Sequence, residues 1–145
     1  MREYLESGAP DLHALGREGV RALVLRLWEE RKEQESLATN GFVADRSSYD
    51  FAAFWLYYRY ARADDVTERM MTETRDGGRY DAVFVLPWGQ MPIARDGVRS
   101  TDRWVQLHIQ VLIEGMVRRH AARVIDVTED SLESRVSFVR RSLVG

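Results

Sequence analysis

The residues of this 145-residue chain best suited to chemistry are Asp45, Arg46, Ser47 and Ser48, which follow the short apolar run Gly41–Asp45. A carboxylate at the end of a buried strand can hold Mg²⁺ through water or accept a hydroxyl proton. The adjacent arginine and a helix amino terminus favour phosphate oxygens. The structural alternative is a loop ion pair between Asp45 and Arg46, followed by a serine helix cap. Both interpretations remain open from these residues alone.

A second candidate is the glycine-containing segment from Arg95 to Arg103, which also holds Arg99. Arginine binds phosphate through two parallel hydrogen bonds and keeps its charge where water is excluded. These properties are typical of a loop that closes over a nucleotide. The alternative is a solvated surface loop, the common role of a charged run.

Residue counts exclude several kinds of chemistry. The chain has no cysteine, which excludes disulfides, thiolate nucleophiles, iron–sulfur clusters and cysteine-based zinc sites. Lys32 is the only lysine, so lysine chemistry has one candidate. His13, His108 and His120 lack metal-ligand spacing to one another, and His108 lies on a predicted apolar helix face, where we expect a hydrogen-bonded core histidine.

Composition is typical of one globular domain: 45% of residues are apolar, 30% are charged and the mean hydropathy is -0.38. The net charge of -2 provides no overall positive field, so we expect neither nucleic acid nor a membrane as partner. The longest aromatic and apolar run, Phe51–Tyr58, is far shorter than the roughly 20 residues that span a bilayer. With no signal peptide at the start, we expect a cytoplasmic protein.

The elements that must position these residues follow from hydrophobic periodicity. Strands alternate with helices along the chain, which predicts an α/β fold with a parallel sheet. Ligands bind beyond the carboxyl ends of such strands, which is where Asp45 and Trp88 fall. We predict helices over 9–36, 47–58, 64–77, 102–116 and 130–143, strands over 41–45, 80–86 and 123–127, and a loop over 88–101.

Particular side chains are expected at particular places in these elements. Asp130 with Glu133 predicts a capping box for the last helix. The predicted buried faces are Leu12, Leu15, Val20, Leu23, Val24, Leu27 and Trp28 in the first helix, Phe51, Phe54, Trp55 and Tyr58 in the second, Trp104, Leu107, His108, Val111, Leu112 and Met116 in the fourth, and Leu132, Val136, Val139 and Leu143 in the last.

Four short motifs, Arg2–Glu6, Val43–Ser47, Tyr80–Pro87 and Asp96–Ser100, occur in an order that resembles the P-loop kinase family. The closest branch contains the nicotinamide-riboside kinase domain of bacterial NAD-biosynthesis regulators and related AAA-type ATP-binding domains. The resemblance covers essentially the whole chain and implies a three-layer P-loop NTPase-like fold. It implies one domain over 1–145, the carboxyl-terminal part of that fold, with a lid-like loop over 88–103.

The resemblance also implies roles for residues at matching positions. The reaction it implies is phosphate transfer from ATP, with Mg²⁺, to a small nucleoside-like hydroxyl compound. Asp45 then carries the magnesium ion through water or acts as the base, and Arg46 lies near the phosphates. Arg95, Arg99 and Arg103 form the lid that meets the transferring phosphoryl group, and Arg2, Glu3, Tyr4 and Trp88 lie by the acceptor.

The 145 residues depart from the family in one respect. They contain no G-x-x-x-x-G-K-[ST] motif, because no glycine here is followed by lysine. The family's opening, with its first strand, phosphate loop and second strand, takes roughly 30 residues or more. In the family the first strand lies between those matching 41–45 and 80–86, so we do not expect a stable monomer with the parental sheet.

Three explanations remain open for this departure. The opening is encoded upstream of Met1, or the two flanking strands pair directly, or a second copy or partner chain covers the exposed sheet edge. We favour the first, because Asp45 and the lid arginines have little use in a scaffold that never held phosphate.

Three functions are therefore carried forward. The first is a small-molecule kinase or ATPase, which is inactive as these 145 residues alone. The second is a non-catalytic remnant that serves as a protein-interaction or regulatory module. The third is a helical partner-binding protein that presents Trp28, Trp55 and Trp104, although aromatic residues at helical spacing are more often core.

Overall fold

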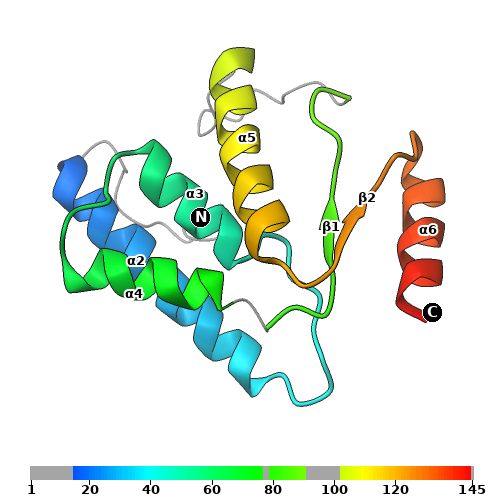
Figure 1. Cartoon of the computed structure of the whole chain (residues 1–145), viewed down its shortest axis with the longest axis horizontal. Coiled ribbons are helices and arrows are strands. Elements are labelled where there is room, and N and C mark those ends of the chain that lie inside the picture. Colours follow the sequence, from blue (N-terminus) through cyan, green and yellow to red (C-terminus); the bar gives the residue numbers. More distant parts are fainter. Residues whose placement is uncertain (1–14, 77–78, 91–101, 145) are drawn as a thin grey trace.

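The structure is a computed structural model that describes residues 15–76, 79–90 and 102–144. Helices dominate it, and two short strands form a small sheet (Figure 1). The helices are α2 (Gly16–Leu37), α3 (Ser48–Tyr57), α4 (Asp65–Arg75), α5 (Arg103–His120) and α6 (Leu132–Val144), and the strands are β1 (Val83–Val85) and β2 (Val124–Asp126).

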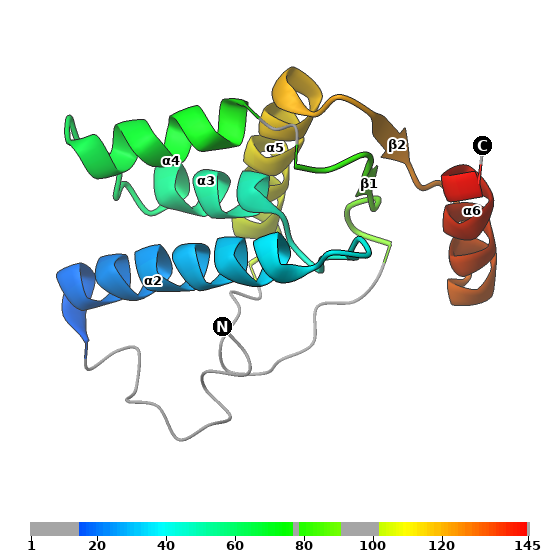
Figure 2. The ribbon, with the colours of Figure 1, turned by 90° about the horizontal axis from the view of Figure 1, so that it is seen from below.

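The core lies between α2, α3 and α4. These three helices lie side by side, and α5 packs across α3 (Figure 2). The periodic apolar face predicted for the first helix is confirmed, because Val24 and Trp28 are buried. They form one cluster with Trp55, Tyr60 and Met70. Trp28 and Trp55 are therefore core residues. The helical partner-binding function requires them on the surface, where only Trp104 of the three lies, with 66% exposed.

Local sequence explains where α3 begins. The predicted serine cap is confirmed: Ser47 and Asp50 form a capping box, in which the Asp50 carboxylate accepts from the Ser47 backbone N–H at 2.7 Å. The face that α3 buries differs from the prediction. Trp55 is fully buried, but Phe51 and Phe54 are only half-buried and Tyr58 is 48% exposed.

The sheet is parallel, as predicted. Val83 lies opposite Val124, and Val85 lies opposite Asp126. Each strand is shorter than the prediction of 80–86 and 123–127, because only the central residues exchange ladder hydrogen bonds. Within the described residues the sheet has these two strands and no others.

The strand predicted over 41–45 is wrong. These residues form no strand, and Val43 is 93% exposed. Among the described residues, none of their backbone N–H or C=O groups pairs with another backbone group. The apolar run predicts a strand only if a neighbouring strand is there to pair with it. Because 41–45 is not part of the sheet, direct pairing between 41–45 and β1 does not occur among the described residues either.

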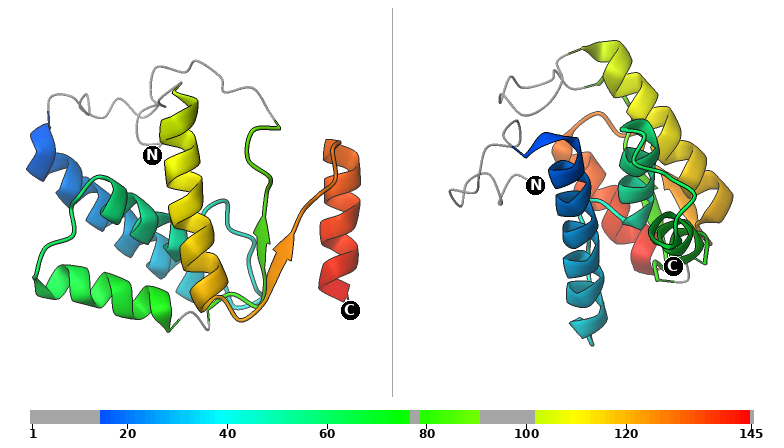
Figure 3. Two further views of the ribbon diagram at one scale, coloured as in Figure 1. Left: turned by 45° about the horizontal axis from the view of Figure 1, so that its top comes forward. Right: turned by 90° about the vertical axis from the view of Figure 1, so that its left-hand side faces the viewer.

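The carboxyl-terminal helix also differs from the prediction. Ser131, and not Asp130, caps α6: its hydroxyl accepts from the backbone N–H of Ser134 at 3.1 Å. Leu132 is 79% exposed, and Val136 and Leu143 are exposed as well. The helix stands apart from α2, α3 and α4, beyond β2 (Figure 3), so its apolar face does not reach the core.

The predicted apolar face of α5 is partly solvent-facing. Leu107, Leu112 and Met116 are half-buried, but Trp104, His108 and Val111 are exposed. His108 is therefore not a core histidine; its ring lies edge-on to Tyr57 at 5.2 Å. No helix in the part of the chain that the structure describes has the length and apolar character needed to cross a membrane.

Acid sensitivity is expected at the amino end of α4. The Asp64 carboxylate accepts from the backbone N–H of Thr67 at 2.9 Å and from Arg21 at 2.6 Å. The Thr67 hydrogen bond, with help from Arg21, lowers the pKa of Asp64 below its usual 3.8. A lowered native pKa stabilises the fold above the unfolded-state pKa, and this stabilisation is lost as the pH falls through the native value.

We therefore expect Asp64→Asn to flatten the acid side of the stability profile. Asparagine still caps the helix but carries no charge for Arg21. Thermal melts between pH 7 and pH 2 measure the effect, and the wild-type advantage should be full above about pH 3.8 and decline as the pH falls from there through the lower native pKa of Asp64. A wild-type advantage that persists at the lowest pH contradicts this assignment.

Candidate functional site

The segment that carries Asp45 and Arg46, here called the Asp45–Arg46 turn, is anchored on both sides. Arg31 of α2 donates a hydrogen bond to the backbone oxygen of Asp45 at 2.9 Å. The capping box of Ser47 fixes the residue that follows the turn. Arg46 itself has a φ of 79°, in the left-handed region that non-glycine residues seldom adopt. An uncommon backbone conformation held from two sides is typical of a functional turn.

The two side chains of the turn point to different surroundings. The Asp45 side chain is exposed and makes no hydrogen bond or ion pair with any residue that the structure describes. The Arg46 guanidinium lies over the ring of Phe54, 5.3 Å from its centroid. The loop ion pair between Asp45 and Arg46, the structural alternative, is therefore not formed, although the serine cap that went with it is. An unpaired carboxylate in water remains available to a cation or a proton.

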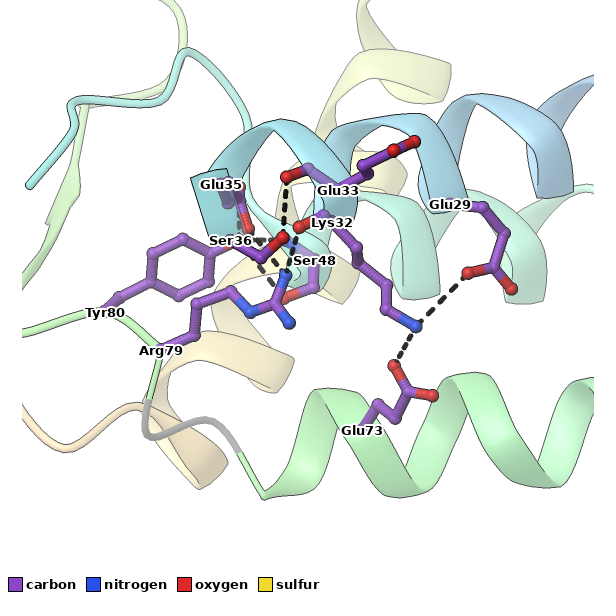
Figure 4. Close-up of polar contacts among 9 residues, drawn as sticks. All are labelled: Glu29, Lys32, Glu33, Glu35, Ser36, Ser48, Glu73, Arg79 and Tyr80. Carbon is purple, nitrogen blue, oxygen red and sulfur yellow. Dashed lines mark hydrogen bonds and ion pairs between the residues drawn. The ribbon is translucent and has the colours of Figure 1, made fainter. Parts of the chain in front are cut away.

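A polar network joins the end of α2 to the start of α3 (Figure 4). The carboxylate of Glu35, whose side chain is 3% exposed, accepts from the Tyr80 hydroxyl at 3.0 Å and from Arg79 at 3.1 Å. The Tyr80 oxygen in turn accepts from the backbone N–H of Ser48 at 2.9 Å. Burial is the main reason why the pKa of Tyr80 lies above its usual value of 10.0, so the hydroxyl keeps its proton.

The only lysine of the chain has a structural environment. The Lys32 ammonium pairs with Glu29 at 3.3 Å and with Glu73 (Figure 4). It also lies 4.2 Å from the centroid of the Trp28 ring. Through the carboxylates of Glu29 and Glu73, Lys32 links α2 to α4.

At the start of α5, the Arg103 side chain contacts two indole rings. The Arg103 guanidinium lies 5.2 Å from the Trp88 ring centroid and 5.1 Å from that of Trp104. Two residues that the sequence assigned separately, Trp88 to the acceptor and Arg103 to the lid, are thus in contact. Asp102 caps the same helix through the backbone N–H of Trp104 at 2.8 Å.

The described residues do not bring Asp45 and Arg103 together. Tyr57, the last residue of α3, is the one that contacts His108 near the start of α5. The Asp45–Arg46 turn precedes the opposite end of α3, and a helix of 10 residues is about 15 Å long. Of the other predicted site residues, Arg2, Glu3, Tyr4, Arg95 and Arg99 lie outside the described residues, as does most of the predicted lid over 88–103.

Glu35 and the role of Tyr80 are not among the features predicted from the sequence. A signal for the first was present, because Glu35 continues the buried stripe of α2 that contains Val24 and Trp28. A carboxylate on a buried stripe needs partners, which indicates a network. Tyr80 falls within the predicted strand, and nothing local to it indicates a contact with Ser48, which lies 32 residues earlier.

Comparison with known proteins gives one match. Residues 1–135 match the family described as AAA domain. No curated protein matches the chain, and no solved structure does. Because the match spans nearly the whole sequence, the chain belongs to the AAA domain family of the P-loop NTPase superfamily.

Proposed function

We propose that this chain is the acceptor and lid part of an ATP-dependent small-molecule kinase or ATPase whose acceptor is a nucleoside-like hydroxyl compound. Family membership supports nucleotide handling. The observation that carries the proposal is the Asp45–Arg46 turn, which combines an anchored backbone with an unpaired, exposed carboxylate.

The donor set at this turn fits Mg²⁺ held through water. Mg²⁺ keeps several waters and is commonly bound by one or two carboxylates together with substrate phosphates. Asp45 offers one such carboxylate, and among the described residues there is no cluster of three metal-ligating side chains that forms a complete protein cage. When bound, Mg²⁺ with ATP supplies charge neutralisation at the phosphates.

The arginines supply the complementary charge in this proposal. Arg46 lies next to the phosphates, and Arg103, whose guanidinium lies over the Trp88 and Trp104 rings, binds a phosphoryl oxygen. Arg95 and Arg99 complete the lid, and Arg2, Glu3 and Tyr4 join Trp88 at the acceptor.

The 145 residues alone are expected to bind ATP weakly or not at all, because they contain no phosphate-cradling G-x-x-x-x-G-K-[ST] loop. Isothermal titration calorimetry with Mg²⁺ and ATP measures this. A submicromolar dissociation constant contradicts the expectation and locates the main phosphate site elsewhere in the chain.

The experiment that tests the function starts from the DNA upstream of the Met1 codon. An in-frame sequence that encodes a glycine-rich loop ending in Lys-Ser or Lys-Thr supports the kinase. The longer protein is then screened for ATP consumption against a panel of nucleosides. ATP consumption that no nucleoside stimulates points to an ATPase, and no ATP consumption at all contradicts both activities.

A second candidate function, a protein-interaction or regulatory module, has one observation in its favour. The segment 41–45 has no regular secondary structure, makes no backbone-to-backbone hydrogen bond among the described residues and exposes 93% of Val43. Unpaired extended backbone can pair with a strand of a partner or of a second copy. An in-frame stop codon close upstream of Met1 supports this candidate over the kinase.

A further inference from the structure

The Tyr80 hydroxyl links a buried carboxylate to the first helical N–H of α3. It donates its proton to Glu35 at 3.0 Å and accepts from the Ser48 backbone N–H at 2.9 Å and the Ser48 hydroxyl at 3.3 Å (Figure 4). A phenol has one proton to donate. Because the Tyr80 hydroxyl donates its one hydrogen bond to Glu35, the lone pairs of its oxygen are directed toward Ser48.

Glu35 is suited to orient the hydroxyl without moving itself. Its side chain is only 3% exposed, and Arg79 neutralises its charge at 3.1 Å. A buried carboxylate with two hydrogen bonds has few alternative positions. The direction of the Tyr80 O–H bond is therefore determined by Glu35 of α2, the helix that precedes α3 in the chain.

The ring of Tyr80 contacts the chain on both sides of the Asp45–Arg46 turn. Phe42, three residues before Asp45, lies edge-on to it at 6.0 Å. Tyr49, three residues after Arg46, lies at 5.9 Å. Together with the Ser48 hydrogen bond, one side chain thus holds both ends of the turn whose Asp45 carboxylate is free.

We infer that Tyr80, oriented by Glu35, is a positioning residue that sets the geometry of the Asp45–Arg46 turn. The inference deepens the proposed function and rests on it for the chemistry that the turn performs. The ring holds the approach to the turn through Phe42, and the hydroxyl holds its exit through Ser48. The turn then presents its carboxylate without using that carboxylate as an anchor.

The test compares two neighbouring tyrosines in the 145-residue chain. Tyr80→Phe removes the hydroxyl that Ser48 and Glu35 use and keeps the ring. Tyr49→Phe is the matched control, since the Tyr49 hydroxyl is buried and has no hydrogen-bond partner among the described residues. Neither measurement below needs nucleotide, so failure of this inference is separate from failure of the proposed function.

Two NMR readouts are expected to change in Tyr80→Phe and to keep their wild-type values in Tyr49→Phe. Amide hydrogen exchange at Ser48 should accelerate at least about fivefold, while amides within α4 and α5 keep their rates. Because the Arg46 guanidinium lies over the Phe54 ring, the ring current of Phe54 should shift the Arg46 Nε–H resonance. In Tyr80→Phe this chemical shift should move toward its value in an unfolded peptide. A purely stabilising role accelerates exchange throughout the helices and leaves the Arg46 resonance in place.

Glu35 provides an independent pair of variants. Glu35→Ala frees the Tyr80 hydroxyl to rotate and should reproduce the effect of Tyr80→Phe at Ser48. Glu35→Gln retains an acceptor and should restore wild-type exchange. An unchanged Ser48 exchange rate in Tyr80→Phe, equal changes in Tyr49→Phe, or no difference between the two Glu35 variants overturns the inference.

Discussion

Trp55→Ala is expected to destabilise the protein by about 3–5 kcal/mol, the usual range for removing a fully buried tryptophan. The side chain is 0% exposed, its indole N–H donates to Thr67 at 3.1 Å and its ring lies 5.6 Å from that of Tyr60. The Arg21 guanidinium also lies over it, 4.7 Å from the centroid. Since domains of this size are stable by roughly 5–15 kcal/mol, this one change removes a large part of the total.

Urea denaturation followed by circular dichroism measures the loss, and Trp104→Ala is the control. Trp104 has the same side chain but is 66% exposed, so its removal should cost less than about 1 kcal/mol. Equal unfolding midpoints for the two variants contradict the assignment of Trp55 to the core between α2, α3 and α4.

The comparison of Trp55 with Trp104 also shows how far helical periodicity predicts burial. In α2 the apolar spacing alone predicts the buried Val24 and Trp28, because a long amphipathic helix has one stripe to bury. In α5 and α6 the same spacing predicts burial for Trp104 and Leu132, yet both are exposed. Whether an apolar stripe is covered depends on which elements pack on it, and that is not local information.

Strands depend on distant partners more strongly than helices do. The apolar run Tyr80–Leu86 forms part of a strand because Val124–Asp126 pairs with it. The run Gly41–Asp45 has a comparable apolar pattern but no ladder, and Val43 is 93% exposed. The backbone N–H and C=O groups of a strand form hydrogen bonds only with a neighbouring strand. An apolar run is therefore not sufficient to predict a strand.

In the candidate site too, local sequence predicts some residues, and long-range contacts determine the rest. Residue chemistry and the order of motifs single out Asp45 and Arg46, and family membership agrees with nucleotide handling. The anchors of the turn are long-range contacts: Arg31 reaches Asp45 from 14 residues away, and Tyr80 reaches Ser48 from 32. No local pattern predicts such pairs, although the buried position of Glu35 on α2 indicates that partners exist.

Asp45→Ala is expected to lower the phosphoryl-transfer rate by about 10²–10⁴-fold in a form of the protein that also carries a phosphate-binding loop. The carboxylate either holds the water shell of Mg²⁺ or accepts the proton of the acceptor hydroxyl, and alanine does neither. Because the Asp45 side chain is exposed and anchors nothing among the described residues, the same change should leave the melting temperature nearly unaltered. Loss of rate without loss of stability separates a catalytic role from a structural one.

Asp45→Asn sharpens this test, because it keeps the size and the polarity of the side chain but removes its charge. It should lose nearly as much rate as alanine, since an amide is a poor Mg²⁺ ligand and a poor base. Asp65→Ala is the control: Asp65 is an exposed carboxylate in the first turn of α4, which supplies no residue to the proposed site. Single-turnover rates at saturating Mg²⁺ and ATP provide the measurement. An Asp45→Asn rate equal to that of Asp65→Ala removes Asp45 from the chemistry, and the unpaired carboxylate of the turn is then a solvated surface group.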